Sequence, residues 1–178
     1  ILDRLRQHAY LTKGIKISFS DERSKDTKEH FSYSFYFEGG VASYVNHIND
    51  GLNPKHDHIF YIQKEADDIV VEISLQYVDD LQARILAFAN NIYNPDGGMH
   101  ITGFQTALTR SLNSYARKNN FLKESEDNLT GEDVKEGLTA IVALKLKNPQ
   151  FEGQTKAKLG NPEARTAVES IFGSTFSE

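Results

Sequence analysis

The sequence predicts an α+β fold in which one antiparallel or mixed sheet carries helices packed on one face. Three observations support this prediction. Apolar residues alternate with polar ones in the first half of the chain, as they do in half-buried strands. In the second half apolar residues recur at helical spacing, and turn residues separate the segments. The length of 178 residues, with no internal repeat, suits one domain.

The composition excludes several classes of protein. With 39% hydrophobic and 25% charged residues, the chain has an ordinary globular composition. Because it contains no cysteine, a disulfide scaffold, a structural thiolate-zinc site and a catalytic cysteine are excluded. No apolar run approaches the ~18 residues of a membrane span, so we expect no membrane partner. The net charge of −5 does not attract nucleic acid to the whole surface, and any such contact must be local.

Four segments in the first half show the pattern of strands: residues 15–20, 31–37, 59–64 and 69–77. The first two are expected to pair antiparallel across a charged turn. The last two are expected to form a hairpin around residues 65–68. Between these two pairs, residues 41–48 have the apolar spacing of a helix.

The second half predicts the remaining elements in turn. Residues 84–92 indicate a further strand, although alanine-rich runs also suit helices, and residues 94–98 form a strong turn signal. The clearest helix covers residues 101–115. Thr130 and Asp133 fit a capping box that begins a short helix. A strand over 139–146 and a loop to Gly160 come next. Pro162 then begins a helix whose apolar stripe meets Gly173.

Both ends of the chain begin or stop within a pattern. Residues 2–10 have the spacing of the last turns of a helix that Gly14 stops, yet no start signal precedes them. We therefore expect the chain to be a fragment of a longer one.

Charge is unevenly distributed along the chain. Four basic residues and no acidic one lie between His100 and Lys123. On a helix, Arg110, Asn113 and Arg117 share one side, opposite the apolar stripe. This side is either an ordinary solvated face or a surface that contacts phosphate groups.

A second feature is the loop Gly153-Gln154-Thr155-Lys156, which follows a predicted strand. A lysine on a glycine-hinged loop offers a compact positive charge that suits a terminal phosphate, and a nearby amide can donate a hydrogen bond. An exposed lysine is also common in surface loops, so the loop alone does not decide its function. It is not a Walker loop.

Other candidate sites are weaker. Gly97-Gly98 at the start of a helix suits either an anion or a tight turn. His56 and His58 share a face on a strand, but no third zinc ligand is evident, and we predict no metal site. His100 suits a packed or capping residue better than a base.

The order of several segments resembles one family throughout nearly the whole chain. These segments are residues 37–40 (FEGG), 71–77 (VEISLQY), 88–92 (FANNI), 97–104 (GGMHITGF), 107–113 (ALTRSLN), 129–138 (LTGEDVKEGL) and 149–156 (PQFEGQTK). Together they resemble the transducer domain of bacterial type IIA DNA topoisomerases, the gyrase B type most closely, with ParE of topoisomerase IV as near kin. Met99 departs from the family, which more usually has threonine there.

The resemblance implies a fold like that of a small-subunit ribosomal protein and the GHMP kinases, with a left-handed β-α-β crossover. It also implies three parts. Residues 1–13 would end an upstream GHKL ATPase domain, residues 14–161 would form the transducer, and residues 162–178 would begin the helix that leads to the cleavage core.

The implied function is coupling of ATP hydrolysis to DNA strand passage and supercoiling. Lys156 would contact the γ-phosphate of ATP bound upstream with Mg²⁺, and Gln154 would assist beside it. Arg110 and Arg117 would line the cavity that holds double-stranded DNA. The implied partners are a second copy of the same protein and the DNA-cleaving subunit, in the bacterial cytoplasm. This chain alone would hydrolyse no ATP, since the nucleotide-binding residues lie upstream.

Two other functions remain open from the sequence. The chain would be a nucleic-acid-binding domain of the same fold if residues 153–158 contacted backbone phosphate in place of nucleotide. It would be a scaffold if its loops contacted only neighbouring domains.

Overall fold

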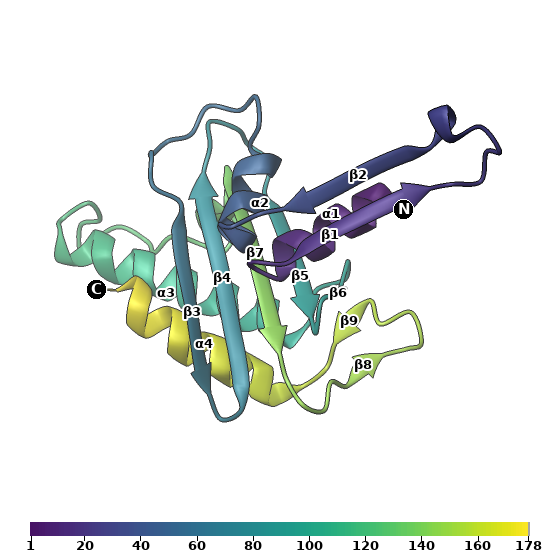
Figure 1. Cartoon of the computed structure of the whole chain (residues 1–178). Helices are drawn as coiled ribbons and strands as arrows, with labels where there is room; N and C mark the ends of the chain where they lie inside the picture. The colour runs from purple at the N-terminus through teal and green to yellow at the C-terminus, as the bar shows by residue number, and fades with distance from the viewer. Residues whose placement is uncertain (178) are drawn as a thin grey trace.

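A five-stranded mixed sheet forms the centre of the computed structural model, which describes residues 1–177 (Figure 1). Neighbouring strands pair antiparallel except β5 and β7, which run parallel. In spatial order the strands are β3 (Phe60–Ala66), β4 (Ile69–Tyr77), β7 (Leu138–Lys145), β5 (Arg84–Ala89) and β6 (Ile92–Tyr93).

Two tight turns set the register of the sheet. The β3–β4 hairpin closes through Asp67 and Asp68, whose φ angles of 52° and 63° suit a two-residue hairpin turn. Asn90 and Asn91 have the same left-handed backbone, with φ of 49° and 62°. The single strand expected over residues 84–92 is therefore wrong at its end, because these two asparagines turn the chain back and begin β6.

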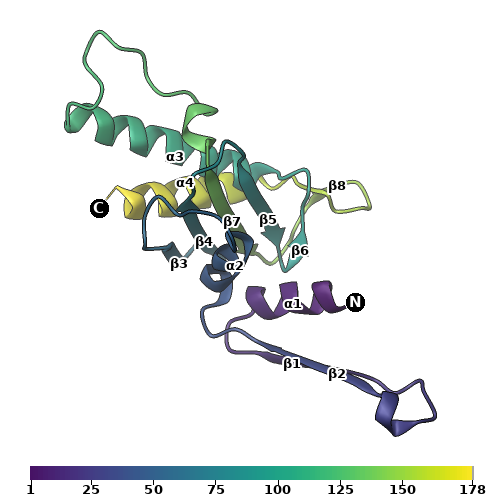
Figure 2. The ribbon, with the colours of Figure 1, turned by 90° about the horizontal axis from the view of Figure 1, so that it is seen from above.

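Two long helices cover one face of the sheet, and two short ones lie on the other (Figure 2). The helices α3 (Met99–Lys118) and α4 (Pro162–Phe176) share a core with the inward residues of β7, among them Leu138 and Val142. On the opposite face α2 (Gly40–Ile48) and the end of α1 (Leu2–Leu11) meet Ile141. The expectation of helices on one face thus holds only for the two long helices.

The β5–α3–β7 connection is left-handed. In Figure 1 both parallel strands point downward with β7 to the left of β5, and α3 lies behind the sheet. Such a path is a left-handed crossover, an exception to the strong right-handed preference.

Gly173 does not end α4, which continues to Phe176. A Cβ atom at Gly173 would lie 3.1 Å from a guanidinium nitrogen of Arg110 and 3.8 Å from the Cβ of Ala107. The glycine therefore serves a close contact between α3 and α4. The last turn is packed as well, because the Phe172 and Phe176 rings stack with centroids 4.8 Å apart.

The first predicted strand pair forms a separate hairpin, which corrects the expectation of one sheet. Strands β1 (Lys16–Asp21) and β2 (Phe31–Tyr36) pair only with each other, and Figure 2 shows them extending away from the main body. A short 3₁₀ turn, η1 (Thr27–Glu29), lies in their connection. Phe31, Tyr33 and Tyr36 are about half exposed on this hairpin.

The capping box is confirmed. The backbone N–H of Thr130 donates to a carboxylate oxygen of Asp133 at 2.7 Å, and the backbone N–H of Asp133 donates to the Thr130 hydroxyl at 3.2 Å. The helix that follows is one 3₁₀ turn, η2 (Asp133–Lys135). In the described part of the chain, no helix has both the length and the hydrophobicity needed to cross a membrane.

Candidate functional site

The Gly153-Gln154-Thr155-Lys156 segment lies at the end of a small hairpin, formed by β8 (Phe151–Glu152) and β9 (Lys158–Leu159). We call residues 153–157 the tip loop. Gly153 has a φ of 78° with no atom within 4 Å of its Cβ position, and Gln154, Thr155 and Lys156 are exposed. The carbonyl of Gly153 accepts a bond from the Lys156 N–H at 3.3 Å, which closes the turn. The tip loop thus presents an amide, a hydroxyl and an ammonium group to its surroundings.

The base of the tip loop is joined to the turn that begins α3. The Asn94 side chain donates to the Lys156 carbonyl at 2.7 Å. The Asp96 N–H donates to the Ala157 carbonyl at 3.0 Å, and the Leu159 N–H donates to the Gly97 carbonyl at 3.0 Å. These bonds fix the base while the tip loop stays exposed.

Gly98 makes this junction possible. Its φ of 135° is accessible to glycine, and a Cβ there would lie 2.3 Å from the Leu159 carbonyl oxygen. Of the two interpretations of Gly97-Gly98, the structure shows the tight turn, which the Gly97 N–H closes by donating to the Asn94 carbonyl at 2.9 Å.

The two lysines of this hairpin have different surroundings. Lys158 forms an ion pair with Glu152 at 3.2 Å. The Lys156 ammonium lies 5.8 Å from the centre of the Phe151 ring, and within residues 1–177 it forms no ion pair with a carboxylate. Lys156 is therefore the lysine whose charge is available to an incoming anion.

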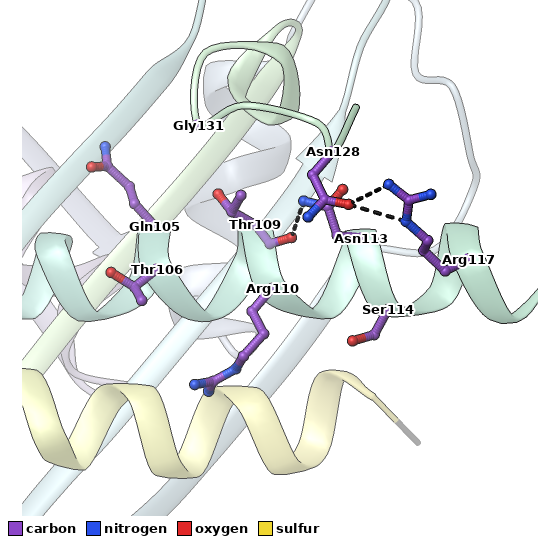
Figure 3. Close-up of a pocket in the computed structure, with 9 residues that line it drawn as sticks. All are labelled: Gln105, Thr106, Thr109, Arg110, Asn113, Ser114, Arg117, Asn128 and Gly131. Carbon is purple, nitrogen blue, oxygen red and sulfur yellow. Dashed lines mark hydrogen bonds between the residues drawn. The ribbon is translucent and has the colours of Figure 1, made fainter. Parts of the chain in front are cut away.

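A groove on the outer side of α3 contains both predicted arginines (Figure 3). We call it the α3 groove, and its volume is about 860 Å³. It runs along the exposed face of α3, with the segment that leads to η2 bordering it on the side away from α4, and α3 itself contains no acidic residue. Its lining residues are Gln105, Thr106, Thr109, Arg110, Asn113, Ser114, Arg117, Asn128 and Gly131.

The arginines differ in their hydrogen bonds. The Arg117 guanidinium donates to the Lys123 carbonyl at 2.5 Å, to the Glu126 carbonyl at 2.7 Å and to the Asn128 side chain at 2.7 and 3.1 Å. Arg117 therefore holds the segment after α3 in place. Arg110 is exposed, points toward α4 in Figure 3, and makes no side-chain hydrogen bond or ion pair in the described part of the chain.

The tip loop and the α3 groove are separate sites. Gly98 adjoins the base of the tip loop, and Arg110 lies twelve positions further along the helix, a rise of roughly 18 Å. The structure brings Gln154 and Lys156 together, and Arg110 and Arg117 together, but it does not bring the two pairs together.

His56 and His58 precede β3 and do not share a face on a strand, which corrects that expectation, and the His56 ring is engaged with the chain's own backbone. The His56 ring contacts the His58 carbonyl through Nδ1 at 2.6 Å and accepts from the Tyr77 N–H through Nε2 at 3.0 Å. Residues 1–177 contain no group of three or more His, Cys, Asp or Glu placed to hold a metal ion. His100 is completely buried, and this burial lowers its pKa to about 4. The ring is therefore neutral at pH 7 and packed in the core, as expected, and its complete burial keeps it out of reach of a substrate.

Comparison with known proteins identifies the family. A family model described as DNA gyrase B matches residues 40–178. The chain belongs to the DNA gyrase B family. DNA gyrase B of Bacillus mycoides is 51% identical over 97% of this chain, and that of Halalkalibacterium halodurans is 49% identical over 99%. The chain spans 42% and 27% of the lengths of these two gyrase B relatives.

The fold agrees with solved structures of the gyrase B family. The 43K ATPase domain of Thermus thermophilus gyrase B, solved with an aminocoumarin, superposes with a TM-score of 0.86 at 38% identity. The match covers 99% of this chain and 46% of that one. The topoisomerase IV ATP-binding domain of Francisella tularensis has a TM-score of 0.74 at 24% identity, which shows a shared fold alone.

Sequence reasoning missed two asparagines in this gyrase B family chain. Asn94 is 1% exposed and bonds to Lys156, and Asn128 accepts from Arg117. Asn94 stood within a recognised turn signal, where asparagine is expected for its own backbone preference. The bond from Asn94 to Lys156 joins residues far apart in the sequence, so no local sequence pattern predicts it.

Proposed function

We propose that the chain is the transducer of an ATP-dependent DNA gyrase, with Lys156 as the group that contacts the γ-phosphate of ATP. In this proposal residues 1–13 end the upstream ATPase domain, residues 14–161 are the transducer, and residues 162–178 begin the helix toward the cleavage core. Lys156 and Gln154 complete the nucleotide site of the upstream domain. The whole protein works on double-stranded DNA with a second copy of itself and the DNA-cleaving subunit, in the bacterial cytoplasm.

The geometry of the tip loop carries this proposal. A lysine without a carboxylate partner among residues 1–177 lies on an exposed turn whose base is hydrogen-bonded to the start of α3. Its cation–π contact with Phe151 is worth only about 0.5–1 kcal/mol at an exposed site. An ammonium–phosphate contact in a closed nucleotide site is stronger, so the side chain can leave the ring for the nucleotide.

The residues present fit part of the nucleotide. The Lys156 ammonium and the Gln154 amide suit phosphate oxygens. Within residues 1–177 no cluster of acidic and histidine side chains suits Mg²⁺, so we assign the metal and the adenine to the upstream domain. Release of the phosphate removes the anion that holds Lys156, and the transducer then moves as a rigid body.

The test of this assignment is ATP hydrolysis measured on two proteins. The 178-residue chain alone is expected to show no turnover, since the tip loop supplies only one side of the site. The full-length protein with its DNA-cleaving partner is expected to hydrolyse ATP and supercoil DNA. Turnover by the purified chain alone contradicts the proposal.

The α3 groove is the proposed DNA-facing surface, with Arg110 as its free cation. Replacing Arg110 with alanine in the full-length protein is expected to weaken binding to duplexes of different sequence equally. The slope of log K against log salt concentration is expected to fall by about 1, as for one lost phosphate contact. Fluorescence-anisotropy titrations at several salt concentrations measure both quantities.

The matched control is Arg23→Ala, which removes the same charge from an exposed arginine paired with Asp21 near the end of β1. We expect it to leave the salt slope unchanged. An equal change in both variants assigns the effect to net charge and contradicts a role for the groove. Arg117→Ala is expected to act mainly by releasing the segment after α3, given its bonds to that segment.

A further inference from the structure

We propose that Asn94 is a positioning residue for Lys156, and that it acts by fixing the backbone from which the lysine side chain extends. The inference rests on the proposed function of Lys156. Asn94 touches neither nucleotide nor DNA in this proposal. It sets where the ammonium stands when the upstream nucleotide site closes.

Asn94 is itself held firmly. Its side chain is 1% exposed, and its backbone N–H donates to the Ala87 carbonyl of β5 at 2.8 Å. Its carbonyl accepts from the Gly97 N–H at 2.9 Å, which closes the turn before α3. A buried amide anchored on the central sheet is a rigid donor.

The Asn94 side chain bonds to the tip loop at Lys156, the residue whose backbone conformation is unfavourable. Lys156 has a φ of 57°, in the left-handed region that a non-glycine residue rarely adopts. Such a conformation persists only where neighbouring contacts hold it. The Asn94 amide donates to the carbonyl of this same residue at 2.7 Å. Among residues 1–177, the other hydrogen bond of the Lys156 backbone is the longer one from its N–H to the Gly153 carbonyl, at 3.3 Å.

The left-handed backbone decides the direction of the lysine side chain. If Lys156 relaxed to the ordinary right-handed or extended region, its Cβ would leave the backbone in another direction, and the ammonium would move with it. Position matters because a contact that stabilises a transition state loses most of its effect when it is displaced by about 1 Å. Asn94 therefore affects turnover through the position of Lys156.

The experiment uses the full-length protein with its DNA-cleaving partner and DNA. Asn94→Ala removes the donor, and Asn94→Asp keeps the size of the side chain while replacing the donating NH₂ with an acceptor. We expect kcat for ATP to fall by about tenfold in both variants, the effect of one lost buried hydrogen bond. The KM for ATP is expected to stay the same, because the upstream domain holds most of the nucleotide.

A double-mutant cycle separates positioning from general destabilisation. In the Lys156→Ala background, Asn94→Ala is expected to lower kcat no further, since there is no ammonium left to position. The matched control is Asn90→Ala, which removes a side chain that bonds both the N–H and the carbonyl of Leu146 and touches no part of the tip loop. That variant is expected to melt at a lower temperature with kcat unchanged for the folded protein.

The outcomes are distinguishable. An unchanged kcat for both Asn94 variants, while Lys156→Ala lowers it, overturns the positioning role and leaves the proposed function standing. An equal fractional loss from Asn94→Ala with and without Lys156 also overturns it, because a purely structural effect is independent of the lysine. An unchanged kcat for Lys156→Ala overturns the proposed function itself.

Discussion

Replacing Lys156 with alanine in the full-length protein is expected to lower kcat for ATP hydrolysis by about 100-fold, the typical effect of removing one donor from a charge-stabilising site. The reason is that charge on the γ-phosphate oxygens must be balanced as the bond breaks, and the ammonium supplies a fixed positive charge there. The KM for ATP is expected to change little. Steady-state kinetics on folded protein, with supercoiling measured in parallel, checks this result.

Lys158→Ala is the control within the same hairpin. It removes the same charge two residues away, from a side chain that already pairs with Glu152. We expect its kcat to stay close to that of the unmodified protein. Equal losses in the two variants indicate a general effect of charge near the nucleotide and remove Lys156 from its specific role.

Gly98→Ala is expected to destabilise the fold by about 3 kcal/mol or more, since two costs add at this position. The backbone, with a φ of 135° and a ψ of −163°, lies in a region that is essentially restricted to glycine. In addition, the new Cβ would lie 2.3 Å from the oxygen and 2.5 Å from the nitrogen of Leu159, so β9 must move away. Urea unfolding followed by circular dichroism measures the change in the free energy of unfolding.

Gly14→Ala provides the comparison for this prediction. Gly14 also has a positive φ, 82°, but no atom lies within 4 Å of its Cβ position. The expected loss is about 1 kcal/mol, from the backbone conformation alone. If both variants lose the same free energy, the contact between Gly98 and β9 is not what makes this glycine necessary.

Local patterns predicted most of the fold. The hairpin of β3 and β4, helix α3 and the capping box at Thr130 all depend on residues close in sequence, and the structure confirms them. Periodicity shows that a helix has a buried side, but not which face of a sheet that side meets. The position of α2 opposite α3 and α4 therefore could not be predicted.

A glycine in a helical pattern either ends the helix or permits close packing against a neighbouring helix, and the sequence alone does not distinguish these two roles. Gly173 was interpreted as the end of a helix, yet the structure uses it for the close approach of Arg110 on α3. The distinction depends on what lies opposite, and that is a tertiary property.

The candidate site was partly predictable. The glycine-hinged loop indicated Lys156 and Gln154 as candidates, and its resemblance to a known family implied their role, while charge spacing indicated Arg110 and Arg117. The contacts that distinguish these residues are long-range. Asn94 and Lys156 are 62 positions apart, and the Arg117 bonds reach backbone carbonyls, which any residue supplies. Neither the composition nor the periodicity of the sequence predicts contacts of these two kinds.

The isolated β1–β2 hairpin affects how this chain behaves once purified. Among the described residues neither strand has a partner on its outer edge, and Phe31, Tyr33 and Tyr36 remain 47–50% exposed. Edges of this kind pair readily with the same edge of another molecule. We therefore expect concentrated samples of the 178-residue chain to associate through this hairpin. Charged substitutions at Tyr33 on one face and Tyr36 on the other are expected to reduce that association.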